Sequence, residues 1–99
     1  MKKITFYTRK LIGGRPCAVL VEGYADGVFS YYKDEYGRWF AVIPTVGLSP
    51  IKTLFASHFT RKSAAEAAYS VLEDVNSWLA EHGDAERAYF NALISKIDA

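Results

Sequence analysis

Few residues of this sequence are of types that could do catalytic or metal chemistry. A structural zinc site needs several Cys or His ligands at recognisable spacing, but the chain has one cysteine, Cys17, and two histidines, His58 and His82, all far apart in sequence. Asp34 and Glu35 are adjacent, but they lie in a turn-forming segment. Such a segment provides no pocket that would give the two carboxyl groups different pKa values, as acid–base catalysis requires. We therefore expect no catalytic residues, no metal and no cofactor, and a binding protein in place of an enzyme.

Basic residues are concentrated in the first two thirds of the chain. Residues 1–62 contain ten Lys or Arg and four acidic residues, a net charge of +6, whereas residues 63–99 contain two and seven, a net charge of −5. This asymmetry can attract an anionic partner such as nucleic acid to the first part and repel it from the second. It is equally typical of a domain whose strand edges carry Lys and Arg while its solvated helix faces carry Glu.

Aromatic side chains make up 15% of the sequence and are interleaved with the basic residues. The expected nucleic-acid-binding residues are Lys33, Arg38, Trp39, Lys52, Arg61 and Lys62. On adjacent strands the basic members of this set can position phosphates, while Trp39, Tyr31, Tyr32 or Tyr36 stack on unpaired bases. The alternative is that the rings belong to the core, because aromatic residues at alternate positions of a strand are commonly buried.

The hydrophobic pattern places these residues on a sheet that is followed by two helices. Alternating segments separated by turn-forming glycines, the first of them the hairpin turn at Gly13-Gly14, predict an antiparallel sheet of about five strands within residues 3–59. Ser63 and Glu66 have the spacing of a capping box, and Gly83 is expected to end the helix that begins there. Asp84 can cap another, so the helices are expected at about 63–82 and 84–97. Strands followed by helices predict an α+β domain.

Length and composition limit the organisation of the chain. With 99 residues, 51% of them hydrophobic and 23% charged, it is expected to form a single domain over residues 1–99. Its longest apolar runs are too short to cross a bilayer, so no membrane partner is expected. A single cysteine permits no intramolecular disulfide, and no signal-peptide pattern follows the basic start, so we expect a cytoplasmic protein.

Two predicted strands, at residues 17–21 and 39–43, are apolar on both faces. One helix cannot cover both faces of a sheet, so either the second helix crosses to the far side or a partner covers it. That partner could be another copy of the chain, which makes a homodimer one expectation.

A family resemblance covers residues 28–79. It is carried by Gly37-Arg38-Trp39-Phe40-Ala41-Val42-Ile43, by the predicted strand from Lys52 to Phe59, and by the Ala- and Glu-rich segment after Thr60. This pattern resembles the three-strand-plus-helix DNA-binding domain of plant ethylene-response factors and the related arm-binding domain of phage-type integrases. In that family the sheet lies in the major groove. The resemblance implies that Arg38 and Trp39 contact DNA, with Lys33 and Lys52 contacting phosphates.

Two functions are therefore expected from the sequence. The first is a small regulatory protein that binds nucleic acid through a basic β-sheet. The alternative is a protein-binding inhibitor or antitoxin-like module, of the kind found in phages and mobile elements, that uses the sheet or the acidic helices. Neither function needs a cofactor.

Overall fold

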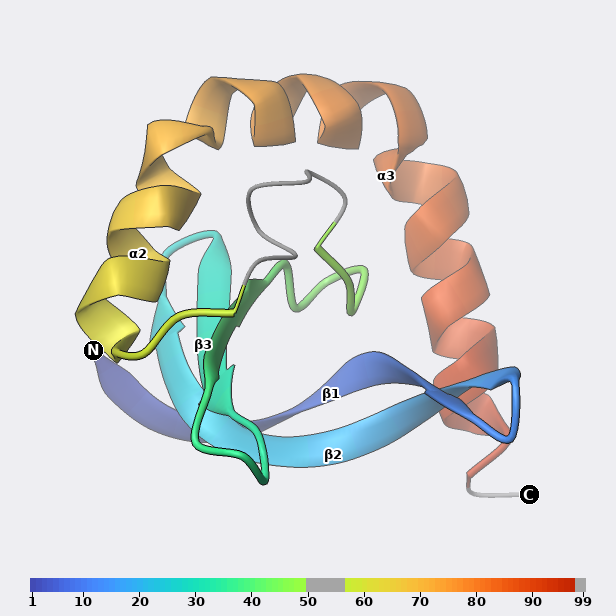
Figure 1. The fold of residues 1–99 in the computed structure, drawn as a ribbon. Helices are drawn as coiled ribbons and strands as arrows, with labels where there is room; N and C mark the ends of the chain where they lie inside the picture. Colours follow the sequence, from blue (N-terminus) through green and yellow to red (C-terminus); the bar gives the residue numbers. More distant parts are fainter. Residues whose placement is uncertain (50–56, 98–99) are drawn as a thin grey trace.

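The computed structural model describes residues 1–49 and 57–97, which form one antiparallel sheet and two helices (Figure 1). Along the chain these elements are β1 (Lys2–Ile12), β2 (Arg15–Asp26), β3 (Phe29–Lys33), β4 (Trp39–Val42), α2 (Arg61–Ser70) and α3 (Leu72–Ser95). Each strand pairs with the next, in the order β1-β2-β3-β4. The predicted α+β class with an antiparallel sheet is confirmed, with four strands in place of about five. The Cα radius of gyration, 13.0 Å, is close to the ~13 Å expected for one domain of about 100 residues.

The fifth predicted strand, at residues 52–59, lies mostly outside the described residues. In its described part, His58 forms a bridge with Trp39 of β4. The Trp39 N–H donates to the His58 carbonyl at 2.7 Å, and the His58 N–H donates back at 2.9 Å. This pair of bonds fixes the chain that enters α2 against the edge of the sheet.

The long β1–β2 hairpin curls until β1 reaches the loop that follows β4. The Arg9 N–H donates to the Gly47 carbonyl at 2.7 Å, and the Thr8 hydroxyl donates to the same oxygen at 3.2 Å. Gly23, which is buried in β2, allows the close approach of β3, because a Cβ at this position would overlap the carbonyl oxygen of Tyr31. The curl therefore requires glycine at this position.

One face of the sheet, here called the inner face, is covered by this curl. Phe6, Tyr32 and Val42 from three different strands pack together there, each at most 9% exposed. The rings of Phe6 and Tyr32 meet edge to face at 6.2 Å. The sequence predicted that the second helix or a partner would cover this face. The hairpin covers part of it through Phe6, and a homodimer stays a prediction.

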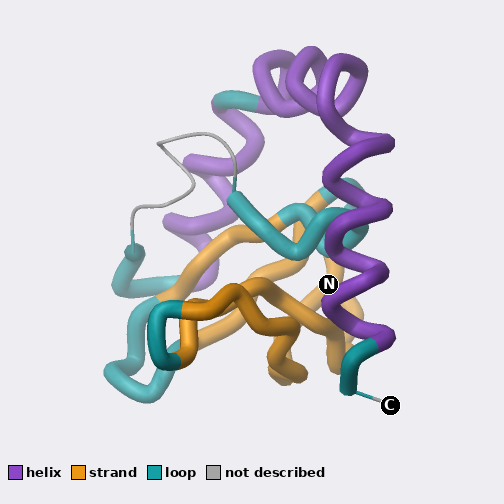
Figure 2. Tube along the Cα trace, turned by 90° about the vertical axis from the view of Figure 1, so that its right-hand side faces the viewer, coloured by secondary structure: helices purple, strands orange, loops and turns teal. Residues whose placement is uncertain are grey.

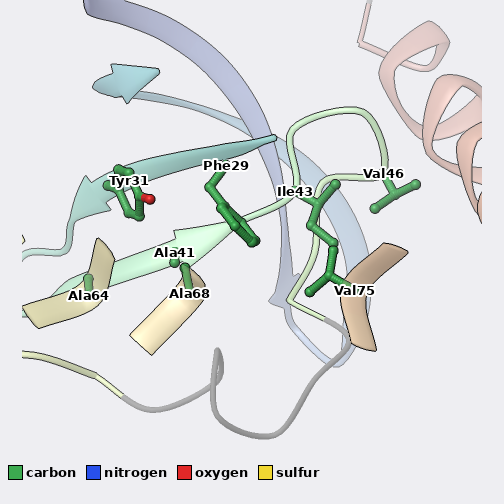
Figure 3. Close-up of a cluster of buried hydrophobic side chains, with 8 residues drawn as sticks. All are labelled: Phe29, Tyr31, Ala41, Ile43, Val46, Ala64, Ala68 and Val75. Atoms are coloured by element: carbon green, nitrogen blue, oxygen red, sulfur yellow. The ribbon is translucent and has the colours of Figure 1, made fainter. Parts of the chain in front are cut away.

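The helices pack on the other, outer face of the sheet. Two alanines of α2, Ala64 and Ala68, are fully buried, and their small side chains let the helix approach the strands closely (Figure 3). The cluster that they complete consists of Phe29, Tyr31, Ala41, Ile43, Val46, Ala64, Ala68 and Val75. The core thus has two layers, one inside the curled sheet and one beneath the helices.

The helix boundaries differ from those predicted. Thr60 caps α2, because its hydroxyl accepts the Ser63 N–H at 3.1 Å, so the predicted capping box at Ser63 and Glu66 is wrong. The helices separate at Val71, which has φ −118° and ψ 21°. Just before it, the Ser70 hydroxyl donates to the Ala67 carbonyl, a bond that competes with regular helix.

The predicted end of a helix at Gly83 and the predicted cap at Asp84 are also wrong, because α3 continues through both residues. The helices arch over the sheet in Figure 1, and Figure 2 shows that the last part of α3 descends beside the strands. There Phe90 and Leu93 pack on Ala18 of β2. Packing at this far end stabilises a helix that the local signals would end earlier. No helix within the described ranges combines the length and the apolar character needed to cross a membrane.

Arg9 joins the three segments that meet at this end of the molecule. Its Nε donates to the Val46 carbonyl at 2.9 Å, and its Nη2 donates to the Glu86 carbonyl at 2.9 Å. The same Nη2 lies 2.8 Å from the Glu86 carboxylate, and the Arg9 side chain is 15% exposed. Its guanidinium also lies over the Tyr89 ring, 4.9 Å from the centroid. β1, the loop after β4 and α3 are therefore held together by one side chain.

We expect Arg9→Leu to lower the free energy of unfolding by about 3–5 kcal/mol, because it leaves the Glu86 carboxylate without its partner and removes the side-chain bonds to two backbone carbonyls. Glu86→Gln should cost less than half as much, since both backbone carbonyl bonds to Arg9 remain. Urea denaturation measures both values. Equal losses in the two variants would show that the ion pair alone, and not the joining of three segments, stabilises this end.

Two glycine substitutions should have opposite effects. Gly23→Ala should destabilise the protein by about 1–3 kcal/mol or more, because its Cβ overlaps backbone that cannot move freely. Gly83→Ala should stabilise it by about 0.5–1 kcal/mol, because the added Cβ would lie at an ordinary distance, 3.5 Å, from the Leu79 side chain inside a helix. Thermal unfolding compares the pair. A destabilised Gly83→Ala variant would contradict a continuous α3.

Candidate functional site

Three of the predicted site residues, Lys33, Trp39 and Arg61, meet at one end of the outer face. Lys33 and Trp39 are directly opposite in the β3–β4 register, and the Lys33 ammonium lies 5.9 Å from the centre of the Trp39 ring system. The Trp39 ring lies 6.1 Å from the ring of Tyr24, measured between centroids. The Arg61 guanidinium lies 4.0 Å from the centre of the Tyr24 ring. Lys33, Trp39, Tyr24 and Arg61 thus form a row of cation, ring, ring and cation, called here the cation–aromatic row.

The strand register and the helix cap create this row. Tyr24 pairs with Tyr31, and side chains alternate along a strand, so Tyr24, Lys33 and Trp39 project from the same face of the sheet. The His58 bridge then brings the chain alongside Trp39, and α2 begins at Arg61. Arg61, the first residue of α2, therefore lies next to the edge of β4.

The row borders a groove between the sheet and α2, with a volume of about 760 Å³. Its lining consists of Met1, Tyr24, Asp26, Trp39, Arg61, Lys62, Ala65, Glu66 and Tyr69. Lys62 therefore joins the other predicted site residues here. The groove combines three aromatic rings with two basic and two acidic side chains, so it can contact a flat apolar group and charged groups together.

Tyr69 holds the helix side of the groove in place. Its hydroxyl donates to the Asp26 carbonyl at 3.1 Å, and its ring meets that of Phe29 edge to face at 5.4 Å. Phe29 is fully buried, so the Tyr69 ring stands against an immobile neighbour. The wall of the groove is therefore formed before any ligand binds.

A second hollow lies on the other side of the two rings. It has a volume of about 480 Å³, and Lys3, Glu22, Lys33, Tyr24 and Trp39 are among the residues that line it. Because Tyr24 and Trp39 line both hollows, their rings form a ridge that is accessible from two sides.

The remaining predicted site residues lie elsewhere. Arg38 precedes β4 and does not line the groove, and its guanidinium lies 4.0 Å from the centre of the Phe59 ring. Lys52 lies outside the described residues. Sequence reasoning missed Tyr24 and Tyr69. Tyr24 could have been identified from the strand register, but Tyr69 faces the groove only because α2 packs where it does.

The groups considered for catalysis or metal binding are separated in the structure. Cys17 is half-buried at the start of β2, and its thiol lies 3.6 Å from the Arg15 carbonyl. The His58 Nδ1 lies 3.0 Å from the Ser63 hydroxyl. Asp34 accepts two backbone N–H groups within its own turn, as the turn interpretation predicted. Within residues 1–49 and 57–97, no group of three or more His, Cys, Asp or Glu side chains is placed to hold a metal ion.

Behind the groove, Tyr31 carries a buried hydroxyl that has no hydrogen-bond partner among the described residues. Burial raises the pKa of Tyr31 well above its usual value, and the negative charge of Asp26 raises this pKa further. Tyr31 is therefore neutral at physiological pH and acts as part of the core.

Comparisons of the chain with protein-family models, with curated proteins and with solved structures found no match.

We expect Tyr31→Phe to leave the free energy of unfolding at pH 7 unchanged, or to raise it by up to about 1 kcal/mol, because it removes an unpaired buried hydroxyl.

The raised pKa of Tyr31 also makes the stability of the protein depend on pH. The unfolded chain loses the Tyr31 proton from about pH 10 and the folded chain only at higher pH, so wild-type stability falls as the pH rises through this range.

The Tyr31→Phe variant should lose less stability than the wild type between pH 9 and pH 11 in urea denaturation. The comparison controls for Tyr32 and Tyr69, whose pKa values burial also raises and which both proteins contain. A variant that is less stable than the wild type at pH 7 would mean that the hydroxyl has a partner.

Proposed function

We propose that this protein binds nucleic acid through the groove and the cation–aromatic row beside it. The observation that carries the proposal is the row itself, in which Lys33 and Arg61 flank the adjoining rings of Trp39 and Tyr24. Two cations on either side of two half-buried rings match a chain of phosphates and bases, since the cations neutralise phosphate while the rings stack on bases.

The distribution of charge on the helices supports this surface. Lys62 is exposed at the start of α2, whereas Glu73, Asp74 and Glu81 are exposed on α3. In Figure 1, the first part of α3, which carries these acidic residues, arches over the side of the molecule away from the β1–β2 hairpin, while α2 runs beside the strands that carry the row. A polyanion is therefore favoured at the groove and disfavoured along α3.

The mode of binding differs from the one implied by the family resemblance. A sheet that enters the major groove must present the face opposite its helix, and here that inner face is filled by Phe6, Tyr32 and Val42. The proposal instead uses the outer face, where α2 leaves the end of the strands uncovered. The kinship with ethylene-response factors and integrase arm-binding domains itself remains a prediction.

A protein partner is the second candidate function, and a different surface supports it. Leu11 and Ile12, at the tip of the β1–β2 hairpin, are 75% and 58% exposed. Exposed aliphatic side chains at a hairpin tip can contribute to a contact with another protein.

The salt dependence of binding tests the proposal. If Lys33, Arg61 and Lys62 contact phosphates, log K should fall with log salt concentration at a slope of about −2 to −3, and Lys62→Gln should reduce the slope by about 0.7–0.9. Lys96→Gln, at the end of α3, is the matched control and should leave the slope unchanged. Fluorescence anisotropy with labelled oligonucleotides gives both slopes. An absence of binding at low salt, or equal effects of the two substitutions, would contradict the proposed function.

A further inference from the structure

The groove contains two carboxylates, those of Asp26 and Glu66, beside its basic side chains. A carboxylate repels the phosphates of a duplex but accepts hydrogen bonds from the amino groups of bases. We propose that the groove holds an unpaired base of a single-stranded nucleic acid, and that Asp26 and Glu66 favour bases that carry an amino group. This inference rests on the proposed function and specifies its ligand.

The aromatic rings of the groove support an unpaired base. Stacking on a protein ring requires a free base face, and in a duplex both faces of each base are covered by neighbouring base pairs. Tyr24 and Trp39 line both hollows, and because the Arg61 guanidinium lies over one face of Tyr24, a base stacks on Trp39 or on the Tyr24 face that Arg61 leaves free. Tyr69 stands on the helix side of the groove and bounds the space that a base would occupy.

The shape of the sheet disfavours a duplex. Readout in a major groove needs an open sheet face or a helix that protrudes from the fold. The inner face is closed by Phe6, and the buried face of α2 lies against the strands through Ala64 and Ala68. A flexible single strand can follow the ridge of rings without either of these elements.

A further ring lies beside the groove. Phe59 is 78% exposed, and the Arg38 guanidinium stacks on it at 4.0 Å. It directly follows His58, the residue that pairs with Trp39. A strand that leaves the groove past Trp39 therefore meets a second stacking position, where Arg38 supplies positive charge. This gives Arg38 a part in binding although it does not line the groove.

The first test compares ligands. Anisotropy should show labelled oligo-dC binding at least about tenfold more tightly than a labelled mixed-sequence duplex of the same length, as expected when a stacked base contributes. Oligo-dC should also bind more tightly than oligo-dT, because thymine has no amino group. A duplex that binds as tightly as oligo-dC would overturn the proposal, while leaving the proposed function intact.

The second test removes one carboxylate. Glu66→Gln should reduce the preference for oligo-dC over oligo-dT, because the neutral amide oxygen is a weaker acceptor than the carboxylate while Asp26 remains in the groove. Glu73→Gln, which removes an exposed carboxylate from α3, should leave the preference unchanged. If Glu66→Gln raises the affinity for both oligonucleotides equally, the carboxylate only repels phosphate, and base selection by the groove is wrong.

The third test removes the second ring. Phe59→Ala should weaken oligo-dC binding by about 5- to 150-fold, and Phe59→Tyr, which keeps a ring, should not. Because Phe59 is 78% exposed, both variants should retain the wild-type unfolding midpoint. If Phe59→Ala binds like the wild type, the strand does not extend to Phe59, and that part of the proposal fails. If no oligonucleotide or duplex binds at low salt, the proposed function fails as well.

Discussion

The structure depends on the closure of its sheet by Arg9. The guanidinium has five N–H donors in a planar fork, and Arg9 directs them at the Val46 carbonyl and at both the carbonyl and the carboxylate of Glu86. The backbone N–H of Arg9 adds the bond to Gly47. These bonds join segments that are distant in sequence, so each forms only when the two segments that it joins have met, and the complete set needs the hairpin, the loop and α3 together. That requirement makes this end of the fold cooperative.

Closure of the sheet at the Arg9 end determines which face of the sheet is free at the opposite end, beside Tyr24. Curling the hairpin places Phe6 over the inner face of β3 and β4, so only the outer face of those strands remains for a ligand. The helices cover the middle of this face with Ala64, Ala68 and Val75. The end of the sheet beside Tyr24 and the beginning of α2 is left open, and this is where the groove lies.

Local features of the fold could be predicted from the sequence, whereas long-range ones could not. The Gly13-Gly14 turn and the order of strands and helices follow from local chemistry, and both are correct. The helix boundaries are not, because Gly83 and Asp84 signal an end that the docking of Phe90 on Ala18 outweighs. In the site, the nearness of Lys33 and Trp39 follows from one hairpin. The stacking of Arg61 on Tyr24 depends on where α2 meets the sheet, which no local pattern specifies.

The division of charge along the sequence has a partly structural origin. Glu86 on the acidic α3 is the partner of Arg9, so this acid and this base serve the fold. Lys10 similarly lies over the Tyr32 ring at 5.2 Å. The positive charge that can face a ligand is therefore smaller than the net +6 of residues 1–62. Beyond a screening length of about 8 Å, distant charges add little, and a ligand at the groove must gain much of its binding energy from the rings themselves.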